Sequence, residues 1–173
     1  MKKDNYFIKA LNGMAYGFFC SLIIGTILKQ LGAFANITEL VTWGEVATLL
    51  MGPAIGAGIG YAIDAKGLNL ISAIIAGCIG AGTFNGNVAG VGNPIVSFVA
   101  VIVAVEVTRF VQGKTPIDIL IVPFTSIVAA GLVTIFVGPY LTKLIVWLGD
   151  LINQGVNMQP LLMSIVVAVL MGM

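Results

Sequence analysis

The feature that most constrains this chain is the length of its stretches without a charged residue. The longest runs from Gly67 to Val105, and another runs from Ile119 to Thr142. A helix needs about 20 apolar residues to cross the hydrocarbon core of a bilayer, so both runs are long enough to contain transmembrane helices. Lipid offers the backbone no hydrogen-bond partners, and a helix satisfies its own. The pattern therefore predicts an all-α integral membrane protein surrounded by a lipid bilayer.

Composition supports this prediction and excludes several classes of function. Hydrophobic residues make up 59% of the 173 residues and charged residues only 9%, against about 25% in an average soluble domain. The net charge is +1 and the basic residues are scattered, which argues against a nucleic-acid partner. The chain has no histidine, the commonest metal ligand and general base. We therefore expect no enzymatic activity, no catalytic residue, no metal site and no cofactor.

Charged residues and one polar, glycine-rich segment divide the chain into helices. We expect a polytopic transmembrane helix bundle with broken or re-entrant segments and about five to six spans, in a single transmembrane domain covering residues 1–173. Glu45 would lie in the first turn of the second span, where the helix dipole stabilises a carboxylate. The expected spans are Ala10 to Leu28, Val46 to Ile63, Leu68 to Phe84, Pro94 to Val111 and Ile119 to Thr142.

Two apolar pieces near the C-terminal end do not fit a simple span. Tyr140 to Ile152 contains Lys143, Trp147 and Asp150 and is too short to cross a bilayer. Because tryptophan favours membrane interfaces, we expect a surface helix or a re-entrant piece here. The last apolar run, Leu161 to Met173, stops without a closing loop or a charged anchor. We therefore expect the chain to be truncated relative to a longer parent.

The distribution of lysine and arginine predicts the orientation in the cell membrane. Basic residues are enriched on the cytoplasmic side of multi-pass proteins. With the N-terminus inside, six basic residues fall in inner segments and two in outer segments. The inner ones are Lys2, Lys3, Lys9, Lys66, Arg109 and Lys114, and the outer ones are Lys29 and Lys143. This bias predicts a cytoplasmic N-terminus.

Glu106 is the strongest single candidate for a functional side chain. A charged residue inside a membrane segment is costly and is therefore a candidate for function. Glu106 closes the longest charge-free run and lies three residues before Arg109, so the two share one helix face. One interpretation is an ion pair that anchors the cytoplasmic end of the fourth span. The other is a carboxylate that faces the path of a solute, with Arg109 beside it.

The segment Asn85 to Pro94 is the most polar part of the long charge-free run. Non-helical backbone at membrane depth is tolerated only where protein or a water-filled cavity satisfies it, and broken helices of this kind build many transporter sites. The alternative is an ordinary extracytoplasmic loop. Pro123 and Pro139 are expected to break the fifth span in the same way. Three amides in the segment both donate and accept hydrogen bonds, which suits sugar hydroxyls; they belong to Asn85, Asn87 and Asn93.

Glycines recur at four-residue spacing in the second span, at Gly52, Gly56 and Gly60. Small residues at this spacing let helix backbones approach closely in lipid. They indicate helix packing or homo-oligomerisation through this face. The alternative is a path on which a solute passes close to the backbone.

Several of these motifs together resemble a known family. They are the glycine-rich stretch from Gly52 to Tyr61, the Gly90-Val-Gly-Asn-Pro-Ile segment, Thr115-Pro-Ile-Asp-Ile-Leu-Ile-Val-Pro and Val137-Gly-Pro-Tyr. The chain resembles the phosphotransferase-system enzyme IIC-like family, and more narrowly its perfringolysin regulator-like branch. The resemblance covers essentially the whole chain and matches the N-terminal half of a family member.

The resemblance implies a membrane-embedded permease-like domain for a small polar solute such as a sugar, usually a homodimer. In true permeases of this system, separate cytoplasmic domains carry the phosphoryl group. Two rival functions follow from the same resemblance: a membrane-bound regulator or sensor without transport, and a half-permease that works only with a partner half.

Overall fold

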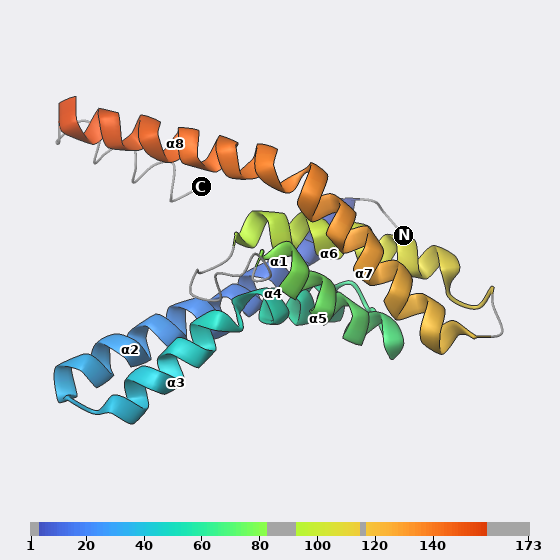
Figure 1. The fold of residues 1–173 in the computed structure, drawn as a ribbon, viewed down its shortest axis with the longest axis horizontal. Helices are drawn as coiled ribbons and strands as arrows, with labels where there is room; N and C mark the ends of the chain where they lie inside the picture. The colour runs from blue at the N-terminus through green and yellow to red at the C-terminus, as the bar shows by residue number, and fades with distance from the viewer. Residues whose placement is uncertain (1–3, 83–92, 115–116, 159–173) are drawn as a thin grey trace. The chain divides into compact units, whose positions relative to one another are not determined.

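The computed structural model describes residues 4–82, 93–114 and 117–158 (Figure 1). All regular elements in these residues are helical, which confirms the predicted all-α class. The chain divides into two compact units, residues 1–138 and 139–173. The first unit holds α1 (Asp4–Phe18), the π-helix η1 (Phe19–Ile23), α2 (Ile24–Ala35), α3 (Thr38–Leu49), α4 (Met51–Ala62), α5 (Leu68–Gly80), α6 (Pro94–Val111) and α7 (Asp118–Phe136).

Three helical stretches among the described residues are long and apolar enough to cross a membrane. They are Tyr6–Ala35, Pro94–Val111 and Asp118–Phe136. A fourth span results if α3 and α4, which bend by 54° at a short break, are counted together. Helix α5 is apolar but has only 13 residues, or about 20 Å of helix. The chain is therefore a polytopic membrane protein with the broken segments that the sequence predicts.

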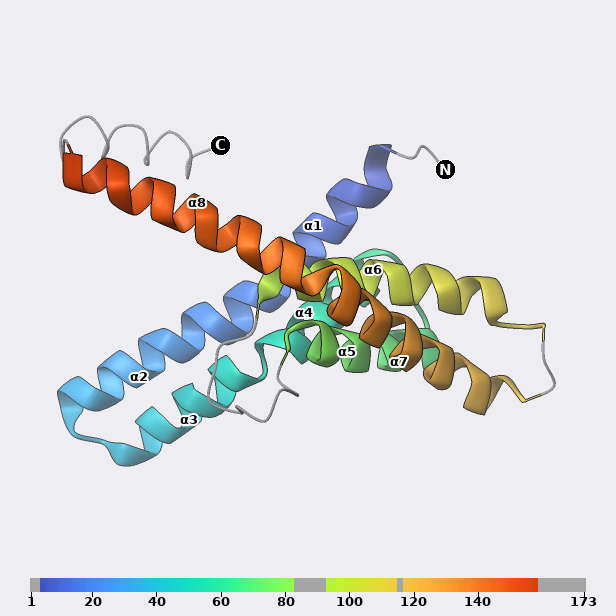
Figure 2. The ribbon, with the colours of Figure 1, turned by 45° about the horizontal axis from the view of Figure 1, so that its top comes forward.

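The first long helix and the bent pair run beside each other and change direction at the same level. Helix α1 packs on α4, α2 packs on α3, and η1 contacts both α3 and α4 (Figure 2). The π-helix inserts extra backbone into the first helix where the second breaks at Leu50. A π-bulge and an irregular residue are both recognised causes of helix bends. Together they let two helices stay in contact through a bend.

The start of the second helix corrects one sequence prediction. Helix α3 begins at Thr38, well before Val46, so Glu45 lies inside the helix and not in its first turn. The carboxylate of Glu45 instead lies 3.9 Å from the ammonium of Lys29 on α2. Both side chains are exposed, so this is a surface ion pair and stabilises the fold by at most about 1 kcal/mol.

The glycine face of α4 is used for packing within the chain. A Cβ on Gly52 would lie 2.8 Å from the carbonyl oxygen of Gly77, and one on Gly56 would collide with the carbonyl oxygen of Ala73. Gly60 lies against Leu70 and Ala73 of the same neighbouring helix α5. Backbones that approach this closely leave no room for larger side chains, which is the small-residue packing predicted from the spacing.

The two prolines expected to break the fifth span behave differently. Pro123 lies inside α7, which continues as helix from Asp118 to Phe136, so the predicted break there is wrong. A proline removes only one helical hydrogen bond, and neighbouring helices support such a defect in membrane proteins. At Pro139 the prediction is confirmed, because α7 ends at Phe136 and α8 (Gly138–Met158) begins beside the proline.

Helix α8 belongs to the second unit and extends the predicted Tyr140–Ile152 helix at both ends. Lys143 and Asp150 lie seven positions apart, hence on one side of the helix. Exposed apolar residues lie on another side of the helix, among them Tyr140, Leu144, Leu148 and Leu151. This amphipathic pattern is typical of a helix that lies at a membrane interface.

Candidate functional site

Helix α6 carries the two charged candidates at one end and an asparagine candidate at the other. Asn93 caps the N-terminus, because its side-chain oxygen accepts hydrogen bonds from the backbone N–H groups of Ile95 at 3.1 Å and Val96 at 3.4 Å. Pro94 follows in the first turn, where its missing N–H costs nothing. Arg109 lies in the last turn, where a cation is stabilised by the helix dipole. Glu106 lies one turn before it.

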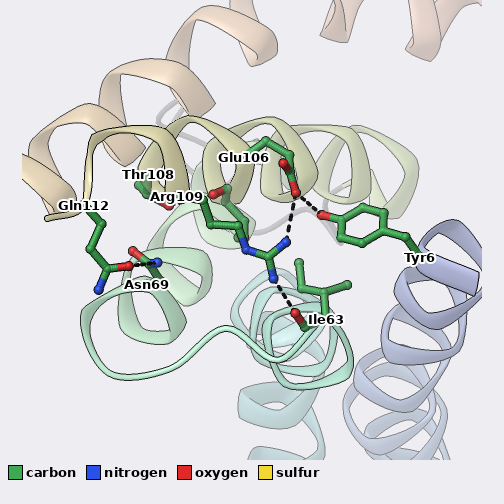
Figure 3. A network of polar contacts seen from close by, with 8 residues as sticks. Tyr6, Ile63, Asn69, Glu106, Thr108, Arg109 and Gln112 are labelled. Carbon is green, nitrogen blue, oxygen red and sulfur yellow. Dashed lines mark hydrogen bonds and ion pairs between the residues drawn. The ribbon is translucent and has the colours of Figure 1, made fainter. Parts of the chain in front are cut away.

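Glu106 accepts two hydrogen bonds through one carboxylate oxygen (Figure 3). The hydroxyl of Tyr6 on α1 donates to Oε1 at 2.5 Å. The guanidinium of Arg109 donates to the same oxygen at 3.1 Å. The ion pair predicted from the spacing is therefore present, and it recruits a third residue from the start of the chain.

Arg109 also joins a third helix to this cluster. A second guanidinium nitrogen donates to the backbone carbonyl of Ile63, the residue that ends α4. The last carbonyls of a helix lack partners inside the helix, and an arginine can satisfy them. The guanidinium carbon also lies 5.7 Å from the centre of the Tyr6 ring, within range of a cation–π contact. Arg109 thus connects the ends of α1, α4 and α6.

The cluster of Tyr6, Glu106, Arg109 and the Ile63 carbonyl is partly exposed. The side chains of Glu106 and Arg109 are 53% and 32% exposed. Water or lipid headgroups can screen such a pair, so its contribution to stability is modest. The same accessibility leaves the second carboxylate oxygen able to accept a hydrogen bond from a solute.

A second polar contact lies at the same end of the bundle and was missed by the sequence analysis. The side-chain amide of Asn69 on α5 donates to the side-chain oxygen of Gln112, which ends α6, at 2.5 Å (Figure 3). Asn69 is buried, with 4% of its surface exposed. A lone amide inside a strongly apolar helix was the available signal, because intramembrane polar residues are rare and usually have partners.

The asparagine candidates do not join the charged cluster in the described residues. Asn85 and Asn87 lie outside the part of the chain that the structure describes. Asn93 and Glu106 lie 13 positions apart at opposite ends of α6, about 20 Å along the helix. The backbone N–H of Asn93 donates to the carbonyl of Ala81 at 3.1 Å, which joins the far ends of α5 and α6. The structure therefore places Asn93 and Glu106 at two separate levels.

In residues 4–82, 93–114 and 117–158, no three histidine, cysteine, aspartate or glutamate side chains gather as a metal site would require. The chemistry that the cluster can perform is hydrogen bonding and charge pairing.

Comparison with known proteins identifies the family. Residues 8–173 match the family model described as "Phosphotransferase system, EIIC". The chain belongs to this family. No curated protein and no solved structure matches it. EIIC domains are the membrane-embedded transport components of the phosphotransferase system, which agrees with the helical spans described above. This EIIC chain is therefore a multi-pass, permease-like membrane protein.

Proposed function

We propose that this EIIC chain forms part of a pathway that moves a sugar or a similar polyhydroxylated solute across the cell membrane. The observation that carries the proposal is the accessible Glu106–Arg109 pair at the end of α6, in a chain with few charges. A carboxylate accepts hydroxyl hydrogen bonds and a guanidinium donates them, so the pair can replace part of a sugar's hydration shell. The chain itself performs no covalent chemistry in this proposal.

The candidate solute-contacting residues are Glu106 and Arg109 at one end, with Asn93 at the other and Asn85 and Asn87 in the adjoining segment. Each sugar hydroxyl that leaves water without a new partner costs roughly 1–3 kcal/mol. Because Asn93 and Glu106 lie at opposite ends of α6, we propose that they act at successive stations along one path. Lys9, Lys66 and Arg109 lie towards the Glu106 end, and we propose that this end faces the cytoplasm.

The homodimer implied by the family resemblance is also a proposal. The glycine face at Gly52, Gly56 and Gly60 is occupied by α5 of the same chain. A dimer must therefore use other apolar surfaces of the molecule. Crosslinking in native membranes, followed by separation under denaturing conditions, would show whether a dimer forms.

The transport proposal is tested by sugar uptake and binding in cells that express the full-length protein. Glu106→Gln should lower uptake several-fold, because the neutral amide accepts hydroxyl bonds more weakly. Glu45→Gln is the matched control, because Glu45 also forms a surface ion pair, with Lys29, but lies on α3 and not on α6. If Glu106→Gln and Asn93→Ala both match the unmodified protein while folding normally, the site lies elsewhere. Sugar binding without uptake would support the rival function as a sensor or regulator.

A further inference from the structure

Two buried polar side chains of α5 hold atoms with no hydrogen-bond partner among the described residues. They are the side-chain oxygen of Asn69 and the hydroxyl of Ser72. Asn69 is 4% exposed and Ser72 is 1% exposed. The two residues are three positions apart, so they share one face of the helix. Polar groups buried this deeply are almost always satisfied, and exceptions require an explanation.

The neighbouring helices bind other polar groups of the same two residues. The amide nitrogen of Asn69 donates to Gln112 at 2.5 Å, and the backbone carbonyl of Ser72 accepts from the Ser126 hydroxyl of α7 at 3.2 Å. Ser126 is itself buried. Asn69 and Ser72 are thus bonded to the end of α6 and to α7, so the contact between α5, α6 and α7 contains both residues.

Ser72 differs from the other buried serines of the described helices. The Ser21 hydroxyl donates to the Gly17 carbonyl of its own helical stretch at 2.7 Å. The hydroxyls of Ser97 and Ser126 donate to carbonyls of the neighbouring α5, at 2.9 Å and 3.2 Å. The Ser72 hydroxyl makes neither kind of bond among the described residues, so it is available to an external partner.

The spacing of the pair fits one bridging oxygen atom. Residues three apart on a helix have Cβ atoms about 5–6 Å apart. At this separation the two side-chain oxygens can both come within hydrogen-bond distance of one hydroxyl oxygen between them. A hydroxyl can donate to the amide oxygen of Asn69 and accept from the hydroxyl of Ser72, or the reverse at Ser72. A metal cation fits less well, because hard cations take about six oxygens and favour carboxylates.

We propose that Asn69 and Ser72 bind one hydroxyl group in the contact between α5, α6 and α7. The hydroxyl belongs either to an ordered water or to the polyhydroxylated solute. The second source rests on the proposed transport function, whereas the site itself does not. The bound hydroxyl would satisfy the side-chain oxygens of Asn69 and Ser72, which destabilise the fold when they have no partner.

The sign of a stability change tests the site in the purified full-length protein without added sugar. If a hydroxyl is bound, Ser72→Ala should lower the thermal unfolding temperature by several degrees. If the serine hydroxyl is truly unpaired, removing it relieves a buried unsatisfied group, and the temperature should rise or stay constant. That result would exclude a bound water, and it would overturn the proposal if glucose and mannitol also fail to raise the unfolding temperature of the unmodified protein. Ser21→Ala is the matched control, because it removes a buried hydroxyl that bonds only within its own helix.

Glucose and mannitol then distinguish the two sources. If either one raises the unfolding temperature of the unmodified protein and Ser72→Ala abolishes that rise, the solute supplies the hydroxyl. If neither sugar does so, while Ser72→Ala still destabilises the protein, the site holds water. The uptake measurements on Glu106→Gln and Asn93→Ala then decide the transport proposal separately. Should Ser72→Ala fail to fold, a high-resolution map of the unmodified protein decides. Density within hydrogen-bond distance of both residues supports the site, and a well-resolved map without it refutes the site.

Discussion

The hydroxyl of Tyr6 donates to the carboxylate of Glu106 at 2.5 Å, across 100 positions of the sequence. This contact joins the beginning of α1 to the last turns of α6. Through Arg109 the same carboxylate is linked to the end of α4. One carboxylate therefore holds the ends of three helices together. A solute that binds the same carboxylate oxygen of Glu106 would compete with these contacts, whereas one that binds the second oxygen would leave them in place.

Tyr6→Phe tests how much the contact stabilises the helix ends. A hydrogen bond to a charged group contributes about 1.5–3 kcal/mol when buried, and the exposure of Glu106 reduces this to about 1 kcal/mol. We expect the unfolding temperature in detergent to fall by a few degrees. Tyr61→Phe should have no effect, because Tyr61 is 76% exposed. If the two variants behave alike, the Tyr6 contact does not stabilise the fold.

Arg109→Lys tests whether both contacts of the guanidinium matter. Arginine offers a planar fork of donors, which here reaches the Glu106 carboxylate and the Ile63 carbonyl together. A lysine ammonium can pair with Glu106 but cannot reproduce both directions. We expect Arg109→Lys to destabilise the protein by about 0.5–1 kcal/mol and Arg109→Met by more. Thermal unfolding of the three proteins would measure this order. Equal stability of the lysine variant and the unmodified protein would show that the Ile63 contact contributes nothing.

Part of the candidate site could be predicted from the sequence. The i, i+3 spacing of Glu106 and Arg109 fixes a shared helix face, and the structure contains that ion pair. The involvement of Tyr6 could not be predicted, because no local pattern reports which helix ends meet in three dimensions. Asn69 and Ser72 were overlooked for a related reason. Single polar residues in an apolar helix gain meaning only when their neighbours, here Gln112 and Ser126, are known.

The fold shows the same division between local and tertiary information. Hydropathy predicts the apolar segments, and α6 occupies the predicted Pro94–Val111 range. Hydropathy does not predict that α3 begins at Thr38, because Glu39 and Glu45 interrupt the apolar run. In the helix, Glu45 extends to Lys29 on the neighbouring α2. The bend at Leu50 and the π-helix opposite it arise from packing between two helices, which a single-helix pattern cannot show.

Two glycine variants test whether close backbone approach stabilises the bundle. Gly56→Ala places a methyl group against the backbone carbonyl of Ala73, so overpacking should cost about 1–3 kcal/mol. Gly131 in α7 is the matched control, because a Cβ there meets nothing within 4 Å. Gly131→Ala should be neutral or stabilise by up to about 1 kcal/mol through helix propensity. The unfolding temperature should fall for Gly56→Ala and should stay constant or rise for Gly131→Ala. An equal shift for both would mean that the glycine face has no packing role.

The cytoplasmic N-terminus is the prediction with the widest consequence, because it decides which side of the membrane the Glu106 cluster faces. Three contacts show which segments lie at the same end of the bundle. Lys9 lies 3.9 Å from Asp64, and Arg109 bonds the Ile63 carbonyl, so the start of α1, the α4–α5 turn and the end of α6 share one end. Asn93 bonds Ala81 at the opposite end of α5. One orientation therefore applies to all of these segments together.

Cysteine labelling in intact cells measures that orientation. In a background with Cys20 and Cys78 replaced by alanine, Lys66→Cys should react with a membrane-impermeant maleimide only after permeabilisation, because the α4–α5 turn is predicted to be inside. Thr38→Cys, at the turn after α2, should react without permeabilisation. Both positions are exposed in the structure, so burial cannot explain a lack of reaction. If only Lys66→Cys were labelled in intact cells, the predicted orientation would be wrong and the N-terminus would lie outside. The Glu106 cluster would then meet the solute on its way in, before the Asn93 end.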